Sequence, residues 1–404
     1  MAAVCRLTSL TLHTLKRPAL QIQKVGAVEC IRGLACLMVL LSHLSLTFYP
    51  QLHNFANQAF QAQGVQSLLY HSPLGFVYSG TAAVFIFFVL SGYILTYVAY
   101  KGTDIPQRVL SMSIKRYPRL MFPACVSCLL AFYLLSHYRV DTHALSPWIN
   151  EYRLSTHASL LDAFYTGVVK VFTVTGINPY NPVLWTMKVE LVGSLLIFLF
   201  IFIRIQKKTK CWYYAVDSII LLSCVLLLCS NWLVPQFSYG IIGFVLGYLS
   251  ALYGRNISNT FAYLLLFFGL YLAGYHENSA SYQWLSIFFT HNSYVLANFL
   301  ASPLIVYAVL FNSQFKMRCS QPLTLFLGKV SFAAYLLHMM LLVTLSAYIF
   351  NSLYQQGINY DIAAITSILV SIPLMYLFAW IFYCLIDRYS LRVSRLLVKI
   401  LLKH

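Results

Sequence analysis

Arg32 and His43 are the first residues along the chain whose types and spacing could do chemistry. They lie eleven positions apart in an apolar run, which is close to three turns of an α-helix, so both share one face about 16 Å apart along the axis. A neutral histidine can act as a general base, and the planar guanidinium of arginine suits phosphate. An interfacial anchor followed by a packing histidine is the simpler interpretation.

Glu190 is conspicuous because it is the one acidic residue well inside a predicted membrane span. A charged group inside a membrane is costly and is therefore a functional candidate. The helical rise places both Glu190 and His43 roughly 10 Å below the outer surface of a ~30 Å core. We therefore expect the carboxylate to orient His43 as a catalytic base. Its simpler role is to neutralise Lys188 or another buried base.

A second basic cluster contains Arg116 and Arg119, where a helix leaves the predicted inner surface. The two guanidinium groups are suited to a cytosolic anion, although ordinary anchoring of a helix end also explains them. Ser91 and Gly92 are small residues that favour close helix packing, and Gly92 also permits a ligand near the backbone. His338, three residues after Tyr335, fits either a site or a packing histidine.

The composition indicates a polytopic membrane protein. The 404 residues are 60% hydrophobic and only 9% charged, whereas a soluble domain carries roughly 25% charged residues. The net charge of +17 does not indicate nucleic-acid binding, because the basic residues are dispersed at the ends of apolar segments. Ten apolar runs predict an all-α bundle of about ten spans, at 29–49, 76–99, 118–137, 183–204, 214–230, 235–254, 259–275, 293–311, 329–350 and 361–386.

Charge asymmetry predicts that both termini are cytoplasmic. With that orientation, most Lys and Arg lie in inner segments, and the outer ones hold only Arg139, Arg153 and Lys170. We expect a cytoplasmic tail over 1–24, one transmembrane domain over 25–395 and a second tail over 396–404. The outer stretch 138–182 is expected to form a cap or re-entrant element. Cys125 and Cys128 are expected to pack between helices rather than to bind metal.

Taken in order, these motifs resemble acyltransferase family 3 of membrane O-acyltransferases. The resemblance covers about residues 26–395. Two departures are Leu191, which replaces a second acid, and the charge of Lys188. The matching elements are Arg32-x10-His43, Phe87 to Tyr93, Arg116-x-x-Arg119 with Pro123, Leu184 to Glu190, Ser331 to His338, and the basic tail from Asp387.

The resemblance implies transfer of an acyl group, usually acetyl, from cytosolic acyl-CoA to a hydroxyl. Acceptors would be a glycan, lipopolysaccharide or a small metabolite, and the protein would lie in the lipid bilayer of the plasma (inner) membrane. It also implies that His43 activates the hydroxyl. Acetyl-CoA would be a donor substrate, with no metal and no permanently bound cofactor. Implied donor-binding residues are Arg32, Arg116 and Arg119, and candidate lining residues, some of them potential oxyanion donors, are Ser91, Trp185, Tyr335 and His338.

Two other classes of function remain open from the residues alone. A secondary transporter of an anionic solute would also use intramembrane charges and a deep cavity. However, no pair of repeated, Gly/Pro-interrupted spans supports transport. A non-catalytic flippase partner or scaffold would tolerate neutral substitutions at His43 and Glu190.

Overall fold

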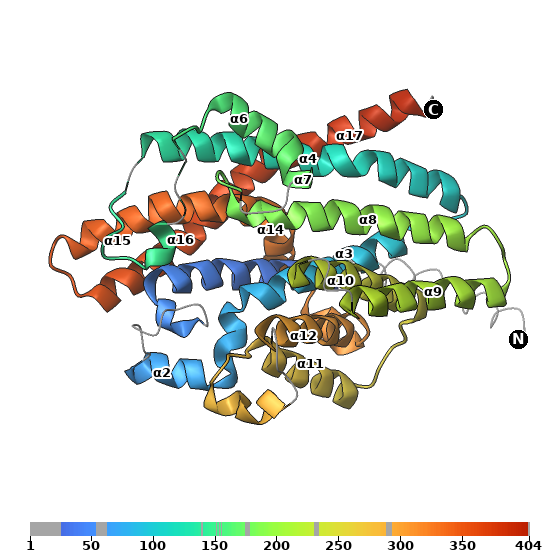
Figure 1. Ribbon diagram of the computed structural model, residues 1–404, viewed down its shortest axis with the longest axis horizontal. Helices are drawn as coiled ribbons and strands as arrows, with labels where there is room; N and C mark the ends of the chain where they lie inside the picture. Colours follow the sequence, from blue (N-terminus) through green and yellow to red (C-terminus); the bar gives the residue numbers. More distant parts are fainter. Residues whose placement is uncertain are drawn as a thin grey trace, which may run out of the picture.

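The computed structural model describes residues 26–53, 63–138, 140–150, 152, 154, 156–173, 178–229, 234–287 and 293–402. All regular structure in these residues is helical (Figure 1), which confirms the predicted all-α bundle. The predicted N-terminal tail, 1–24, lies outside the described residues.

The main helices follow one another along the chain with short connections. Their bounds are Gly26–Phe48 for the first helix, α2 Gly64–His71, α3 Gly80–Ala99, α4 Ile105–His137, α5 Pro147–Asn150, α6 Leu160–Tyr165, α7 Val171–Thr173, α8 Trp185–Arg204, α9 Lys210–Cys229, α10 Pro235–Tyr253, α11 Asn259–Ala273, α12 Ser293–Leu310, α13 Ser313–Arg318, α14 Pro322–Leu341, α15 Ala347–Tyr354, α16 Tyr360–Phe382 and α17 Arg388–Leu401.

Within the described ranges, nine helices are long and apolar enough to cross a membrane. The remaining predicted span, 259–275, corresponds to α11, which has 15 residues. At 1.5 Å per residue α11 is about 22 Å long, shorter than the ~30 Å hydrocarbon core. The count of about ten therefore consists of nine full-length spans and one short helix.

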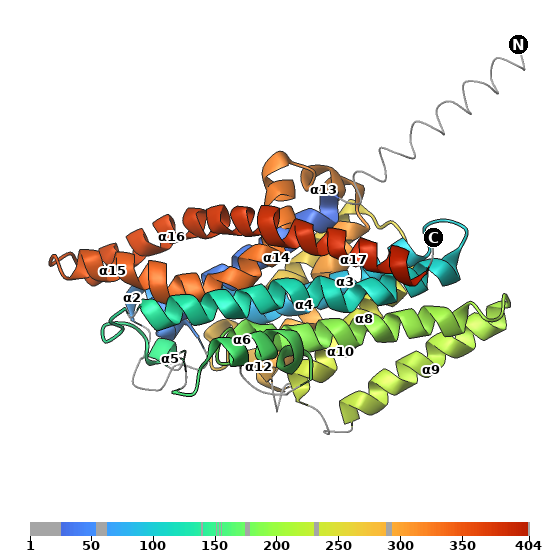
Figure 2. The same cartoon turned by 90° about the horizontal axis from the view of Figure 1, so that it is seen from above.

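Among the described residues, three helical stretches are much longer than predicted, and one of them is Pro322–Tyr354 with 33 residues. α4 has 33 residues and starts at Ile105 rather than near 118, which makes it about 50 Å long. The helical stretch Tyr360–Leu401 has 42 residues, or about 63 Å. α17 therefore includes most of the predicted tail 396–404, and it runs beside the first half of α4 (Figure 2).

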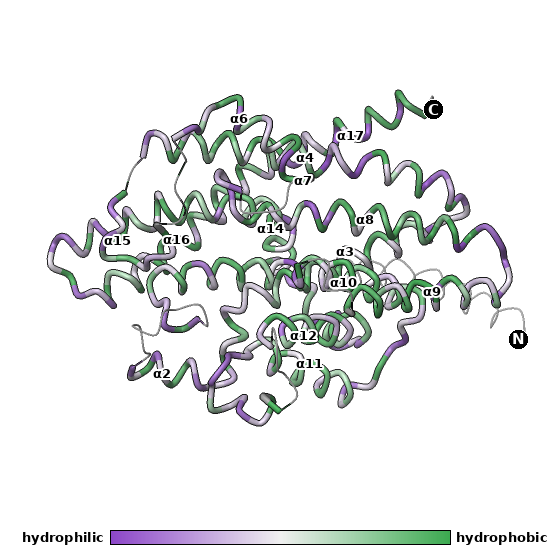
Figure 3. Tube along the Cα trace, viewed as in Figure 1, coloured by the Kyte–Doolittle hydropathy of each residue, from purple (hydrophilic) through white to green (hydrophobic). Residues whose placement is uncertain are grey.

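The helix ends and connections that carry basic residues lie at one end of the bundle. The α3–α4 connection, the α8–α9 connection and the C-terminal end lie at the same end of the bundle (Figure 1). Lys101, Lys207 and Lys208 lie in these connections, and hydrophilic stretches mark them (Figure 3). The assignment of this basic end to the cytoplasm stays a prediction.

Gly92 and Gly247 hold α3 and α10 at backbone contact. A Cβ on Gly92 would lie 2.0 Å from Phe244 O, and a Cβ on Gly247 would lie 2.0 Å from Val89 O. Small residues of this kind allow helices to approach closely in lipid. Packing therefore accounts for Gly92.

We expect Gly92→Ala to destabilise the protein by about 1–3 kcal/mol, because an added methyl group in a tight core forces the helices apart. Thermal unfolding in detergent measures the effect. Gly243→Ala is the matched control, since its Cβ would meet Phe88 Cβ at an ordinary 3.4 Å. Equal unfolding temperatures for the two variants would contradict this role of Gly92.

Candidate active site

A cavity of about 510 Å³ lies among the first helix, α3, α4, α8, α14 and the start of α17. Its walls are apolar where Phe87, Phe88 and Ile94 line it. A π-helical turn, Tyr383–Asp387, joins α16 to α17 at this cavity, and such turns are frequent at functional sites. The charged lining residues are Glu29, Arg32, Arg116, Arg119, Glu190, Lys329 and Asp387.

Glu190 and Arg116 form a buried ion pair between α8 and α4. Their side chains are 15% and 10% exposed, respectively. Ser91 Oγ donates a hydrogen bond of 2.8 Å to the same carboxylate, and Arg116 Nε donates one of 2.6 Å to Ser194 Oγ. Glu190 therefore neutralises a buried base, which was the simpler of its two predicted roles, and that base is Arg116 rather than Lys188.

The expected contact between Glu190 and His43 was wrong. Thr186 Oγ1 is 3.1 Å from the hydroxyl of Tyr335, so the first turn of α8 lies level with Tyr335. Counting the helical rise from there places Glu190 about 10 Å inward of His43. The depth estimate failed because it placed the start of the helix at the outer surface.

The outer segment enters the bundle before α8 begins. The 3₁₀ turn Pro182–Leu184 precedes α8, and Val183 and Leu184 are buried. Asn181 Nδ2 donates to Leu336 O at 2.8 Å, which fixes this turn against α14. The predicted cap or re-entrant element over 138–182 stays a prediction.

Arg119 is exposed to the cavity and, within the described part of the chain, its guanidinium makes no hydrogen bond or ion pair. Pro123 lacks the N–H that would normally reach Arg119 O four residues earlier. Ser390 Oγ of α17 donates to that carbonyl at 3.2 Å instead. α17 is thus attached to α4 beside a cation that is available to a ligand.

Lys329 is a cavity residue that the sequence analysis missed. It is exposed at the cavity, and its Nζ lies 5.3 Å from the centre of the Tyr383 ring. Arg32 is less available, because Glu29 lies 3.5 Å from it. The sequence offered one signal for Lys329. It is the first residue of the predicted span 329–350, at the same predicted inner end of the bundle as Arg32.

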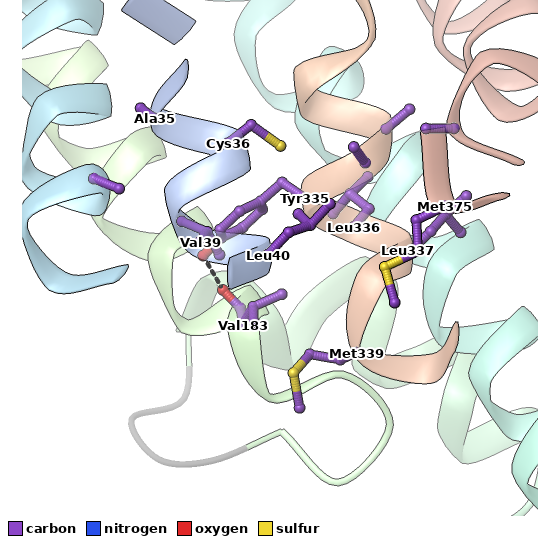
Figure 4. Close-up of a cluster of buried hydrophobic side chains, with 14 of the residues drawn as sticks. Ala35, Cys36, Val39, Leu40, Val183, Tyr335, Leu336, Leu337, Met339 and Met375 are labelled. Carbon is purple, nitrogen blue, oxygen red and sulfur yellow. Dashed lines mark hydrogen bonds between the residues drawn. The ribbon is translucent and has the colours of Figure 1, made fainter. Parts of the chain in front are cut away.

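Tyr335 lies between the cavity and the predicted base. It lines the cavity, and its hydroxyl donates to Val183 O at 3.0 Å (Figure 4). Its ring centre is 5.8 Å from that of His338. With its proton committed to Val183 O, the Tyr335 hydroxyl has no second proton to offer an oxyanion.

His43 and His338 are in contact on the outer side of Tyr335. His43 Nδ1 lies 3.1 Å from His338 Nε2, and His338 is fully buried while His43 is half-buried. Trp148 of α5 stacks on His43, with ring centres 5.6 Å apart and an interplanar angle of 20°. The structure thus pairs His43 with a second histidine rather than with a carboxylate.

Trp185 does not join these residues. Its side chain is 36% exposed, it contacts Phe88 edge-on, and it does not line the cavity. Cys125 and Cys128 are free and buried. A Cβ on Gly167 would lie 2.4 Å from Cys125 Cα, so this stretch of α4 packs tightly against the outer segment.

The chain matches the acyltransferase-3 family model, described as an acyltransferase domain, over residues 25–384. The chain belongs to this family. It is therefore an acyltransferase and an integral membrane protein, and the transporter and scaffold alternatives give way to an enzyme. Searches of the curated proteins and of the solved structures found no significant match.

Two further histidines of the acyltransferase, His53 and His276, lie outside the spans. They belong to a group of short elements at the predicted outer surface, which we call the outer layer: the turn Pro50–Leu52, α2, the turn Pro73–Tyr78 and the turn Ala280–Ile287. His276 stacks on Tyr70 and Tyr78, with ring centres 4.9 and 5.7 Å away. Burial lowers the pKa of His276 to about 4. Burial, with His276 nearby, lowers the pKa of His53 to about 3.

We expect the outer layer to lose stability as the pH falls below about 6.5, the ordinary histidine pKa. Below that pH the unfolded chain binds protons at both histidines, whereas in the folded protein His53 and His276 bind them only near pH 3–4. Acid therefore favours unfolding of the outer layer, and its full stability is reached only above pH ~6.5. Hydrogen exchange in residues 63–78 measures this, and His276→Phe should reduce the pH dependence. Constant protection between pH 7 and 4.5 would contradict it.

Proposed function

We propose that this acyltransferase transfers an acetyl group from cytosolic acetyl-CoA to a hydroxyl of a glycan, lipopolysaccharide or other cell-surface or small-molecule acceptor, in the plasma (inner) membrane. One observation carries the proposal. A single cavity extends from the accessible cations Arg119 and Lys329 to Tyr335, whose next helical turn carries a histidine in contact with His43.

The cations at the cavity suit the phosphates of the donor. Among the residues that the structure describes, Arg119 and Lys329 form no ion pair within 4 Å, and Arg32 lies 3.5 Å from Glu29. Arg116 has a different role, because Glu190 and Ser194 already bind it. We therefore reassign phosphate binding from the predicted three arginines to Arg119, Lys329 and Arg32.

The apolar wall suits the pantetheine arm and directs the thioester outward. The distance from Arg32 to His43, about 16 Å along the helix, is comparable with the reach of that arm. Tyr335 lines the cavity and its ring centre is 5.8 Å from that of His338, so the thioester would pass the Tyr335 side chain to reach His43. The acceptor would approach from the outer side, where Trp148 covers one face of His43.

The reaction needs a base and no redox partner. His43 takes the proton of the acceptor hydroxyl while its oxygen attacks the thioester carbonyl. The new C–O bond forms, the C–S bond breaks, and the thiolate of coenzyme A receives the proton from His43. The products are the acetyl ester and free coenzyme A.

Donor binding tests the proposal directly. The double variant Arg119→Met, Lys329→Met should weaken acetyl-CoA binding to the purified full-length protein by at least ~100-fold, because it removes two charge-assisted contacts of about 1.5–3 kcal/mol each. Isothermal titration in detergent measures the dissociation constant. Lys101→Met is the control, since Lys101 is an exposed cation that does not line the cavity. Unchanged binding by the double variant would reject this donor site.

The acceptor is identified by comparing cells that contain or lack the gene. Mass spectrometry of surface glycans and extractable metabolites should show one acceptor that carries hydrogen in place of one acetyl group in the deletion strain. Restoration by the wild-type gene, but not by His43→Phe, would link the ester to this enzyme. Identical profiles would reject the proposed transfer.

A further inference from the structure

The first helix and α14 run together in a constant register. A Cβ on Gly33 would lie 2.7 Å from Gly328 N, so the two helices touch at these glycines. Cys36 Sγ donates to Ser331 O at 3.3 Å, with the same sequence offset of 295 residues. Further outward, the same offset brings the two histidines into contact. The glycine contact therefore sets which residue of α14 faces the predicted base.

Hydrogen-bonding rules then determine where each histidine carries its proton. His338 Nδ1 lies 2.7 Å from Tyr335 O. A carbonyl oxygen only accepts hydrogen bonds, so His338 Nδ1 carries the proton, and Nε2 of the neutral ring must be an acceptor. His43 Nδ1, which is 3.1 Å from that Nε2, must therefore be the donor.

The first helix imposes the same state on His43. Its Nδ1 is also 3.1 Å from Val39 O, which again only accepts. Both neighbours of Nδ1 therefore require a proton there. Nε2 then holds the lone pair of the neutral ring, and in the described part of the chain it has no hydrogen-bond partner.

We propose that His338 is the positioning residue of the catalytic base. It accepts the Nδ1 proton of His43, orients that ring and leaves Nε2 as the atom that deprotonates the acceptor. This inference rests on the proposed function, in which His43 is the base. The roles resemble those in other catalytic groups where a third residue orients a histidine, but here the orienting group is neutral.

In this arrangement the transferred proton moves only through Nε2 of His43. The acceptor hydroxyl gives its proton to His43 Nε2, and the resulting imidazolium keeps its Nδ1 proton, donated to His338 Nε2. His338 neither gains nor loses a proton. His43 Nε2 then gives its proton to the leaving thiolate. Trp148, stacked on the ring, offers a π face to the imidazolium.

¹⁵N NMR of the full-length, histidine-labelled protein in detergent tests the assignment without relying on activity. Both His43 and His338 should show a protonated Nδ1 and an unprotonated Nε2 at neutral pH. Assignment uses loss of the corresponding signals in His43→Phe and His338→Phe. A protonated Nε2 on His338 would overturn the proposal, because that ring would then donate to His43.

Steady-state acetyl transfer provides the second readout. His338→Phe keeps a ring of similar size but removes the acceptor, so kcat should fall about 10- to 100-fold, as expected for loss of a hydrogen bond to a charged group, while the KM for acetyl-CoA stays unchanged. His338→Gln presents a carbonyl oxygen and should recover most of this loss. A merely structural role would not produce recovery of kcat at constant KM.

The outcomes separate this proposal from the function on which it rests. Wild-type kcat in His338→Phe together with an inactive His43→Phe would overturn the role of His338 and leave the proposed function standing. An active His43→Phe would reject His43 as the base, and the role of His338 with it. If His338→Phe does not fold, His338→Gln assigns the His338 signals, and the wild-type tautomers still decide the proposal.

Discussion

Replacing His43 with Phe should lower acetyl transfer by about 10²- to 10⁴-fold, the usual contribution of a general base. Phe preserves the ring that stacks on Trp148 but has no nitrogen to accept a proton. Because His43 does not line the donor cavity, acetyl-CoA binding should remain unchanged. Turnover in reconstituted membranes and donor titration measure the two effects separately.

His143→Phe is the matched control for this experiment. The His143 side chain is 97% exposed in the outer segment, so the substitution changes residue type without touching the site. It should keep wild-type turnover. Wild-type turnover by His43→Phe, or equal losses of donor binding and turnover, would contradict the assignment of His43 as the base.

Arg116→Met should destabilise the protein by about 3–5 kcal/mol, because it leaves the Glu190 carboxylate buried and unpaired. The ion pair is well shielded, with 10% and 15% of the two side chains exposed. Glu190→Gln should also destabilise, by leaving the guanidinium without its counter-charge. Thermal or denaturant unfolding in detergent measures both variants.

The double variant Arg116→Met, Glu190→Gln should recover much of this loss, since it removes both charges together. Arg32→Met is the comparison, because the Arg32–Glu29 pair is 34% and 25% exposed at 3.5 Å. A pair so open to solvent contributes at most about 1 kcal/mol. Equal stability of Arg116→Met and Arg32→Met would show that burial of the first pair has no energetic consequence.

The two positions also distinguish structural from catalytic roles for Glu190. If the ion pair acts by shaping the cavity, activity should return with stability in the double variant. If that variant is stable but inactive, Glu190 has a chemical role beyond neutralising Arg116. The first result is expected, because the carboxylate contacts Arg116 and Ser91 and lies about 10 Å inward of His43.

The sequence by itself determined the membrane class, most of the spans and several of the residues that line the cavity, among them Arg32, Arg119 and Tyr335. Apolar runs reveal spans because lipid requires helices with internally satisfied backbones. The spacing of Arg32 and His43 on one helix was equally readable, since the helical repeat relates positions within a single element. Motif order identified the family, which the match over 25–384 confirms.

Only the tertiary structure decided which residues face one another. Hydropathy reports approximate depth but neither the rotation of a helix nor its neighbour, so Glu190 was assigned to His43 when it binds Arg116. The contact between Gly33 of the first helix and Gly328 of α14 sets the register of the two helices, which are almost 300 residues apart in the chain. This register places His338 against His43. Such contacts depend on packing, because in lipid close backbone approach determines which helices pair.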